Sequence, residues 1–380
     1  MLKNYIGLLM LNEQEDNIKS LTKTRPIASI PIGGRYRIID FVLSNMVNSG
    51  IHNIGVFTCS KSRSLVDHID SGRSWDLDRK TNGLFLFNFT SDKSKLGDID
   101  VLSDNMEFIY RAKQDYVIMS SSYMVCNMDY NEPAKYHEES GSDVTFLYKI
   151  INNGKENFVN CSTLYVNEEN KVLSIGKNMG AKDKLNISME MFIMKKSTLI
   201  TIINKCIQTG YHNSIKAAIY NSISELNVNA YEFKGYLQCV NSIKNYYKTN
   251  MDMLNTKITK ELFASKRLIY TKSKDEAPSK YFNGSKVSNT LVSNGCILKG
   301  KIENSIISRR VVVHVGAEIK NCIIFQGCEI KEGCKLINVI IDKNTIIHEN
   351  TVLIGAKEFP IVIEKKISAI TIQETKGVLV

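Results

Sequence analysis

The stretch SLTKTRPIASIPIGGRYRIIDFVLSNMVNSGI, residues 20–51, decides the first half of the fold. Its first part contains two prolines and a Gly-Gly pair, so it is predicted to be a loop with fixed turns rather than a regular helix or a central strand. In its second part, over residues 38–47, apolar side chains recur at steps of three and four. This spacing predicts a helix with one buried face, which Gly50 would end.

Three arginines, Arg25, Arg35 and Arg37, lie on the loop beside the start of this helix. Guanidinium groups and free backbone N–H groups both suit phosphate oxygens, so the loop is a candidate phosphate-binding segment. The alternative is a surface turn with solvated arginines, and composition alone favours that alternative.

Length and composition limit the class of protein. With 380 residues, 43% of them hydrophobic, the chain can bury a large core and form two domains. We find neither a run of apolar residues long enough to span a bilayer nor a signal core, so we expect a cytoplasmic protein without a membrane partner. The nine cysteines are scattered without C-x-x-C pairs, which indicates reduced and mostly buried thiols. The formal net charge of +10 comes from dispersed lysines, which favours phosphorylated ligands over nucleic acid.

The pattern up to about residue 245 predicts an α/β domain with a mixed, mostly parallel sheet and flanking helices. Apolar or alternating runs typical of strands cover residues 5–11, 53–59, 115–121, 142–150 and 188–194, and a hairpin is predicted over 160–175. Helices are predicted over 62–69 and 105–113, and a polar, irregular insertion over 82–104. His68 is expected on a helix surface rather than at a catalytic position.

From residue 285 onward the period becomes six residues. Two series carry it, one formed by Ile324, Ile330 and Leu336 and the other by Cys322, Cys328, Cys334, Ile340, Ile346 and Val352. Such a period predicts a left-handed parallel β-helix, in which all these side chains point inward and stack. The predicted organisation is therefore an α/β domain over 1–245, a connecting helix and linker over 246–284, and a β-helix over 285–380.

The opening stretch resembles a known family. Its pattern LT-x-x-R followed by GG-R-Y-R-IIDF-x-LSN-x-VNSGI is similar to the sugar-nucleotide-binding segment of the glucose-1-phosphate adenylyltransferases, the ADP-glucose pyrophosphorylases of glycogen and starch synthesis. The resemblance covers nearly the whole chain. It implies that the first domain is a Rossmann-like nucleotidyltransferase domain.

The chain departs from this family at the catalytic positions. The family's glycine-rich motif G-G-x-G-T-R-L falls on residues 12–18, where the substitutions include Asn12, Glu13, Glu15, Asp16 and Asn17. A family lysine is replaced by Ile27, and the two aspartates that bind magnesium in the family are replaced by Tyr123 and Ala217. The three new carboxylates should repel a triphosphate, because like charges about 4 Å apart near a protein surface cost about 4 kcal/mol.

Other parts of the resemblance are retained. Lys177 stands where the family's E-K-P segment holds the sugar phosphate, although Gly176 replaces the glutamate. Ser188 begins SMEMFIM, which matches the family's S-M-G-I-Y-V-F beside the sugar pocket. Arg25, Arg35, Lys177 and Ser188 are therefore the residues expected to provide any remaining phosphate or sugar binding.

The resemblance implies a non-catalytic or weakly catalytic regulatory subunit in glycogen biosynthesis. We expect it to assemble with a catalytic glucose-1-phosphate adenylyltransferase subunit as a hetero-tetramer, with a homo-oligomer as an option when alone, and to respond to a phosphorylated metabolite. No cofactor or metal is expected in this chain, and Mg²⁺ would be bound by the catalytic partner.

Three alternatives remain open. The chain could be an active sugar-phosphate nucleotidyltransferase whose metal site is rebuilt on Asp100 or Asp129. It could be a hexapeptide-repeat acyltransferase with His314 or His348 as general base, although the large first domain has no place in such an enzyme. It could also be an interaction scaffold that retains only the fold.

Overall fold

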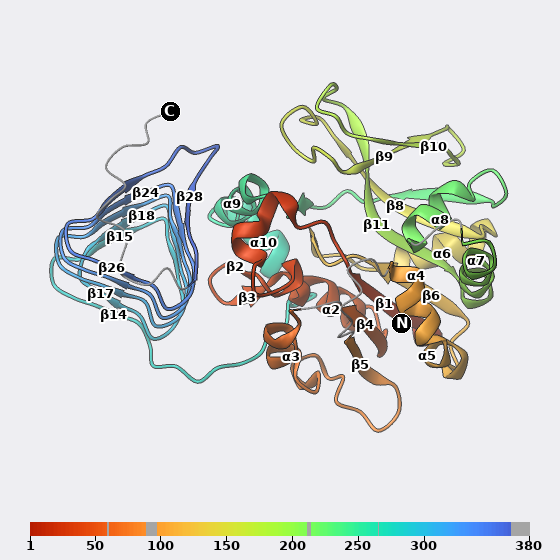
Figure 1. The fold of residues 1–380 in the computed structure, drawn as a ribbon, viewed down its shortest axis with the longest axis horizontal. Coiled ribbons are helices and arrows are strands. Elements are labelled where there is room, and N and C mark those ends of the chain that lie inside the picture. Colours follow the sequence, from red (N-terminus) through yellow and green to blue (C-terminus); the bar gives the residue numbers. More distant parts are fainter. Residues whose placement is uncertain (59–60, 89–96, 211–213, 265, 366–380) are drawn as a thin grey trace.

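The computed structural model describes residues 1–58, 61–88, 97–210, 214–264 and 266–365. They form an α/β domain and a β-helix that lie side by side, as Figure 1 shows. Within these described ranges, no helix combines the length and apolar character needed to cross a membrane.

A nine-stranded sheet forms the centre of the first domain. Its main path runs β10-β9-β11-β6-β1-β4-β5, β8 also pairs with β11, and β12 pairs with β8. Strands β6, β1, β4 and β5 are parallel, whereas β11 is antiparallel to β6. The bounds are Tyr5–Leu11 (β1), Asn53–Thr58 (β4), Gly83–Asn88 (β5), Tyr116–Ser120 (β6), Val144–Ile151 (β8), Ser162–Val166 (β9), Val172–Lys177 (β10), Leu185–Lys195 (β11) and Val228–Glu232 (β12). The predicted mixed, mostly parallel sheet is confirmed, and Cys59 of the predicted strand 53–59 lies outside the described residues.

Helices cover both faces of this sheet, and the side chains of β1 alternate between the two cores that result. Tyr5 and Leu9 join one core with α2 (Ile38–Asn48), α3 (Arg63–Ile69) and α6 (Asn131–Ser140). Ile6 and Leu8 join the other. That second core includes residues of α4 (Asp98–Asp104), α5 (Met106–Arg111), α7 (Lys196–Thr209) and α8 (Ile215–Asn221).

The opening stretch forms the predicted loop and helix. Between residues 16 and 37 the chain makes only short turns: η1 (Asp16–Ile18), α1 (Lys19–Thr22), η2 (Ile27–Ser29) and the strand pair β2 (Pro31–Ile32) and β3 (Tyr36–Arg37). The Gly-Gly pair joins β2 to β3 with φ of +58° and +81°, values that glycine adopts without strain. Helix α2 then starts where the Asp40 carboxylate accepts the Arg37 N–H at 2.9 Å, a cap that satisfies a free backbone donor.

The predicted irregular insertion over 82–104 is wrong where the structure describes it. Residues 83–88 form the edge strand β5, parallel to β4, and residues 98–104 form α4, while residues 89–96 lie outside the described part. Strand β5 is held by aromatic packing, since Phe87 stacks on Phe57 with ring centroids 4.7 Å apart. The flanking polar residues concealed this apolar run.

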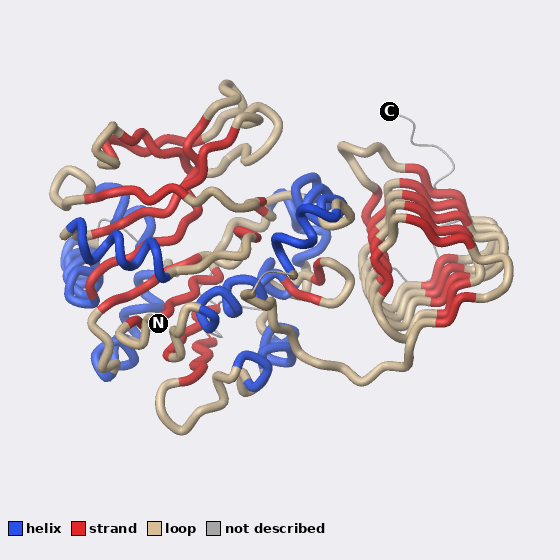
Figure 2. Tube along the Cα trace, turned by 180° about the vertical axis from the view of Figure 1, so that it is seen from behind, coloured by secondary structure: helices blue, strands red, loops and turns tan. Residues whose placement is uncertain are grey.

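The second domain is a parallel β-helix of the hexapeptide type. Its three sheets each contain five short parallel strands, and Figure 2 shows the stacked coils from behind. The sheets are Lys280–Tyr281 (β14), Ile297–Leu298 (β17), Val312–Val313 (β20), Glu329–Ile330 (β23) and Ile346–Ile347 (β26); Lys286–Ser288 (β15), Lys301–Glu303 (β18), Glu318–Lys320 (β21), Lys335–Ile337 (β24) and Val352–Ile354 (β27); and Leu291–Val292 (β16), Ile306–Ile307 (β19), Ile323–Ile324 (β22), Val339–Ile341 (β25) and Ile361–Ile363 (β28).

Three elements lie near the predicted limits of the connecting segment, 246–284. Helix α9 (Ile243–Asp252) crosses the predicted boundary at 245, and α10 (Thr256–Phe263) follows it. The first coil strand, β14, starts at Lys280 rather than at 285. The remaining short strands, β7 (Met124–Val125) and β13 (Gln238–Cys239), pair with each other beside the main sheet.

The predicted six-residue inward series holds for one coil and then fails. Cys322, Cys328 and Cys334 stack in the β-helix interior, but Ile346 and Val352 are 50% and 58% exposed. One corner is a residue shorter than the others, and Asn321 and Asn338, 17 residues apart, occupy it with left-handed φ values. Asparagine tolerates this conformation. The short corner therefore moves the interior positions to Val339 and Ile341 in the next coil.

The displaced Ile340 faces the first domain instead. It belongs to the same core as Ile306, Ile323 and Tyr246 of α9, so one sheet of the β-helix packs against the α/β domain. A buried ion pair between Arg25 and Asp342 adds to this interface, with side chains only 3% and 4% exposed. The two domains thus share a continuous core.

Candidate functional site

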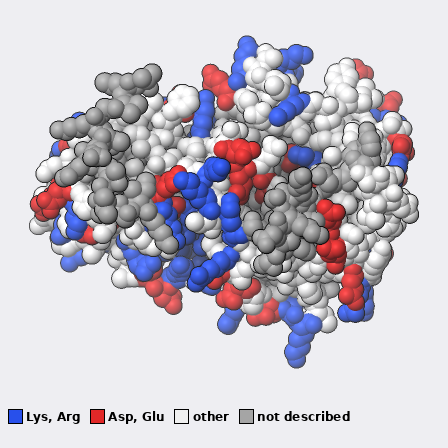
Figure 3. All heavy atoms as spheres, in the orientation of Figure 1, with Lys and Arg blue, Asp and Glu red and all other residues white. Residues whose placement is uncertain are grey.

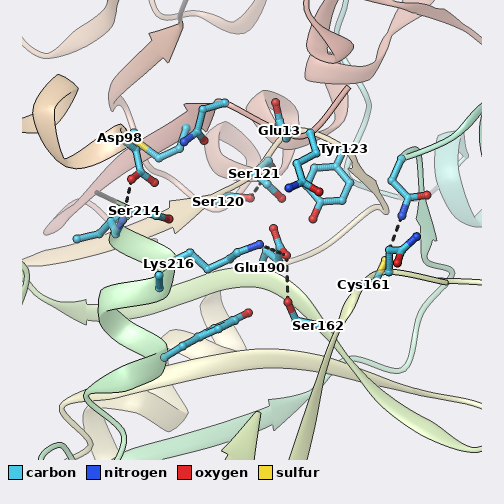
Figure 4. Close-up of a pocket in the computed structure, with 18 of the residues that line it drawn as sticks. Glu13, Asp98, Ser120, Ser121, Tyr123, Cys161, Ser162, Glu190, Ser214 and Lys216 are labelled. Carbon is cyan, nitrogen blue, oxygen red and sulfur yellow. Dashed lines mark hydrogen bonds and ion pairs between the residues drawn. The ribbon is translucent and has the colours of Figure 1, made fainter. Parts of the chain in front are cut away.

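A pocket of about 740 Å³ lies where the parallel strands β1 and β6 end. Its walls come from the loop after β1, the residues after β6, strand β11 and the start of α8. The carboxyl ends of parallel strands are the usual place for a ligand site in such a domain. Figure 4 shows polar side chains from all four segments directed into this space.

Seven of the eight degenerate positions line this pocket together. They are Asn12, Glu13, Asp16, Asn17, Ile27, Tyr123 and Ala217. The eighth, Glu15, is not part of the lining, and its carboxylate lies 3.5 Å from Nζ of Lys61. The positions at which the sequence departs from the family are therefore one site in space.

The charge of the loop after β1 differs from the predicted three negative charges. Glu13 accepts hydrogen bonds from the backbone N–H and the hydroxyl of Ser122, both at 2.7 Å. Burial nevertheless raises the pKa of Glu13 to about 7, so its carboxyl group is close to half protonated at neutral pH. The charge of Glu15 is offset by Lys61, which lies beside it. Asp16 is therefore the one acid of this loop that faces the pocket without a hydrogen bond or paired cation among the described residues.

An ion pair that the sequence reasoning missed crosses the pocket. Glu190 of β11 is 8% exposed and accepts a hydrogen bond from Nζ of Lys216 at 2.7 Å, as Figure 4 shows. Glu190 has φ of +54°, and its backbone N–H donates to Oγ of Ser188 at 3.2 Å. The signal was present in the resemblance, because Glu190 stands at the glycine of the matched S-M-G segment.

Tyr123 completes this internal arrangement. Its ring is 9% exposed and lines the pocket. Burial, followed by the nearby Glu190 carboxylate, raises the pKa of Tyr123 well above its ordinary value, so the phenol stays neutral. The position therefore supplies a neutral ring in place of a carboxylate.

The four expected phosphate or sugar ligands do not come together. Lys177 lines the pocket, whereas Ser188 is fully buried behind it, with its hydroxyl 3.3 Å from that of Tyr220. Arg25 is engaged with Asp342 at the domain interface. Arg35 lies on a separate surface, with its guanidinium 5.2 Å from the ring centroid of Tyr36.

That separate surface is a basic cluster at the junction of the two domains. Its members are Arg35, Arg37, Lys274, Arg309 and Lys343, which line one small depression. Burial, and then the charges of Arg37 and Arg25, lower the pKa of Lys343 to about 7. Figure 3 shows Lys and Arg side chains gathered along this junction. Closely spaced cations that lower one another's proton affinity favour binding of an anion.

His68 lies at the edge of the basic cluster and corrects a prediction. It is 6% exposed rather than on a helix surface, and its Nε2 lies 2.6 Å from Oδ1 of Asp40. Its ring meets Trp75 edge-on. Burial lowers the pKa of His68, so it is a neutral structural residue that fixes the start of α2.

The pocket does not fit a magnesium ion of the kind the family uses. Magnesium is normally held by one or two carboxylates plus substrate phosphates. Tyr123 and Ala217 provide no such oxygen, and Glu190 and Glu13 are held by Lys216 and Ser122. Two further acids line the pocket: Asp98 accepts the N–H of Ile215 at 2.7 Å and so caps α8, and Asp16 offers a single carboxylate. Across the described residues, no three His, Cys, Asp or Glu side chains converge as metal ligands would.

Comparisons with known proteins agree with this architecture. The nucleotidyl transferase family matches residues 17–158, and the GlmU-like C-terminal hexapeptide family matches residues 277–358. The glycogen biosynthesis protein GlgD of Bacillus subtilis is 34% identical over 95% of both chains. GlgD of Geobacillus stearothermophilus is 33% identical, over 83% of this chain and 82% of that protein. The glucose-1-phosphate adenylyltransferase of Fervidobacterium nodosum is 31% identical, over 90% of this chain and 84% of that protein. The chain therefore belongs to the glucose-1-phosphate adenylyltransferase family and is, within it, a GlgD-like glycogen biosynthesis protein.

Proposed function

We propose that the chain is a regulatory subunit without substantial catalytic activity, which assembles with a catalytic glucose-1-phosphate adenylyltransferase in glycogen synthesis. The observation that carries this proposal is the Glu190–Lys216 ion pair across the pocket. It puts a carboxylate and its own cation in the pocket that a sugar phosphate and a triphosphate would have to share. The names of the two GlgD relatives, which mention glycogen biosynthesis rather than adenylyl transfer, support the same reading.

The chemistry of adenylyl transfer explains why this pocket is unsuited to it. The triphosphate must be held in line with the attacking sugar phosphate, and cationic groups must neutralise the charge that develops. Here the loop after β1 offers Asn17 in place of arginine and adds the carboxylate of Asp16. Loss of the metal ion alone would remove several kcal/mol of transition-state stabilisation. These losses fall on one site, so they act on the same step.

An active enzyme with a rebuilt metal site is less well supported. Asp100 caps α4, where its carboxylate accepts the N–H of Gly97 at 3.1 Å. Asp129 accepts the N–H of Asn131 at 3.0 Å at the start of α6. Neither residue is part of the pocket lining, so neither can replace the missing ligands without a rearrangement.

An acyltransferase is also less well supported. His314 is bonded to Glu329 at 2.8 Å, and His348 is exposed on the outside of a coil. We place the β-helix in assembly instead, because its last coil exposes apolar side chains. Val352 and Ile354 are each 58% exposed, and Phe359 is 80% exposed. Such a patch suits the catalytic adenylyltransferase subunit as partner, in a hetero-tetramer.

Regulation would act through the basic cluster. Cationic side chains from both domains converge there, so a phosphorylated metabolite would bridge the domains on binding. Because the shared core couples the β-helix to the α/β domain, binding there can bias the surface that meets the partner.

The test is ADP-glucose formation from ATP, glucose 1-phosphate and Mg²⁺. The chain is assayed alone and then mixed with a catalytic relative, beside a matched variant, Val352→Lys with Ile354→Lys, that disrupts the apolar patch. We expect no turnover alone, an altered rate, affinity or effector response in the mixture, and no alteration with the variant. Magnesium-dependent turnover by the chain alone would overturn the proposal.

A further inference from the structure

Two cysteines meet beside the pocket, and one of them, Cys161, lines it. Sγ of Cys161, on the loop before β9, lies 3.4 Å from Sγ of Cys239 on β13, and both thiols are free. A disulfide needs the sulfurs at about 2.05 Å, so they have to approach by about 1.4 Å. Two thiols in contact across 78 residues of chain are already positioned for that bond.

The contact between these thiols differs from the surroundings of the cysteines in the β-helix. Cys296, Cys322, Cys328 and Cys334 each donate their S–H to a backbone carbonyl within the coils. Their hydrogen-bonding capacity is used by the fold, and each stands in a stack of apolar side chains. Cys161 and Cys239 use each other instead.

Cys161 is the cysteine on the pocket side of the pair, and its residue is 2% exposed. It is part of the pocket lining, together with the cations Lys177 and Lys216. Nδ2 of Asn241 lies 3.6 Å from its Sγ, so the sulfur has a hydrogen-bond donor beside it. Cys239 is fully buried, and burial followed by the neighbouring Cys161 raises the pKa of its thiol well above the ordinary value. The two cysteines therefore differ in position, because Cys161 lines the pocket and Cys239 lies behind it.

The loop that carries Cys161 lies outside the strands of the main sheet. Phe158 and Asn160 both have left-handed φ values, +56° and +68°, so the segment is an irregular turn rather than part of a strand. Cys239 lies on the two-residue strand β13, which pairs with β7. Strand β7 begins directly after Tyr123.

We propose that Cys161 and Cys239 form an oxidisable dithiol site that takes a small hydroperoxide as its co-reactant. The thiolate of Cys161 attacks the terminal peroxide oxygen, so the O–O bond breaks, an S–O bond forms, and hydroxide or an alkoxide leaves and takes up a proton. The thiol of Cys239 then displaces the oxygen from the resulting sulfenic acid, which forms the S–S bond and releases water. The two thiols lose two protons and two electrons, and the peroxide is reduced to two waters or to water and an alcohol.

The experiment treats the full-length chain with hydrogen peroxide and maps its cysteines by non-reducing peptide mass spectrometry. We expect the peptides of Cys161 and Cys239 to appear as one linked species, which dithiothreitol separates again. With Cys239→Ser, the sulfenic acid of Cys161 should be trapped by dimedone several-fold more than in the unmodified sequence. With Cys126→Ser as the matched control, the cross-link should form as before.

An internal marker shows whether the oxidant acted. Met179 is 73% exposed and gives its sulfoxide readily. Oxidised Met179 beside two free thiols at positions 161 and 239 would overturn the proposal, as would a cross-link of Cys161 to another cysteine. The unmodified chain gives this answer by itself, so a variant that fails to fold leaves the test intact.

Discussion

The carboxylate of Glu190 lies 2.7 Å from Nζ of Lys216, and it is held there from a backbone position with φ of +54°. The pair is asymmetric, because the glutamate side chain is 8% exposed and the lysine 40%. A non-glycine residue in this conformation costs of the order of 1 kcal/mol or more, so the ion pair and the hydroxyl of Ser188 offset backbone strain.

The two halves of this pair should respond differently to mutation. Lys216→Met leaves the buried carboxylate without its cation, which should lower the free energy of unfolding by about 1–3 kcal/mol. Glu190→Gly should cost less, because glycine adopts the left-handed conformation freely and regains about 1 kcal/mol. Urea unfolding of both variants measures this. The control is Lys205→Met, which breaks the exposed pair with Glu225 and should change stability by less than about 0.5 kcal/mol. Equal losses for the two pocket variants would contradict the asymmetry.

Restoring the two aspartates should restore little activity. Tyr123→Asp with Ala217→Asp returns the oxygens that the family uses, but Glu190 and Lys216 still occupy the pocket and Asp16 still faces it. We expect ADP-glucose formation by this double variant to stay near the blank. Adding Glu190→Gly should raise ADP-glucose formation further, because this change removes the side chain at the position of the family's glycine. Full activity of the double variant alone would show that metal loss is the whole defect.

The local elements were predictable where one period governs a whole segment. The helix Ile38–Asn48 follows from apolar steps of three and four, and the β-helix from its six-residue step. The corner at Asn338 is one residue shorter, and the six-residue step did not predict this. The step describes only the side chains that point into the coil, and a corner residue is not one of them. Ile346 and Val352 were therefore assigned to the wrong side of the coil.

The site was predictable as a set of positions but not as a set of contacts. Alignment with the family identified Tyr123 and Ala217 as neighbours in function, and they do line one pocket. Arg25 and Asp342 are 317 residues apart, so no local pattern links them, and Arg25 read as a free phosphate ligand. A buried ion pair can be recognised only after the fold brings its two halves together.

Glu13 should make stability depend on pH in a defined direction. Its pKa rises from 4.5 to about 7 on folding, so between these values the folded chain holds a proton that the unfolded chain has lost. The stabilising contribution is fully present below the lower value and disappears as the pH rises through 7. The unmodified chain should therefore lose about 1–2 kcal/mol more than Glu13→Gln between about pH 5 and about pH 8. Urea unfolding at both values decides this, and parallel losses would contradict it.

Removing Arg25 should weaken the whole molecule. Arg25→Met leaves Asp342 buried and unpaired at the domain interface, which should cost about 3–5 kcal/mol. Arg25→Met with Asp342→Leu should recover most of this loss, because a buried pair can be replaced by apolar side chains at little net cost. Thermal and urea unfolding give the values. The control is Lys23→Met, since the pair of Lys23 with Glu364 is exposed and should contribute less than about 1 kcal/mol. No recovery in the double variant would contradict the argument.

Anion binding at the basic cluster should take up protons. The pKa of Lys343 is lowered to about 7, first by burial and then by Arg37 and Arg25, so at about pH 8 most of its amines are neutral. A bound pyrophosphate ion favours the charged amine, and its binding should therefore be accompanied by uptake of about half to one proton. Calorimetric titration with inorganic pyrophosphate in buffers of different ionisation enthalpy measures this number directly.

Two variants separate the contribution of Lys343 from general attraction of the anion to a basic chain. Lys343→Met should abolish the proton uptake and weaken the binding of pyrophosphate by about tenfold, which corresponds to about 1.4 kcal/mol. Lys301→Met removes an exposed lysine that is paired with Glu318, and both residues lie on one sheet of the β-helix outside the basic cluster. This variant should leave the proton uptake and the affinity for pyrophosphate unchanged. Uptake that persists in Lys343→Met would assign the proton to a different group. Equal weakening by both variants would mean that pyrophosphate responds only to the net charge of the chain.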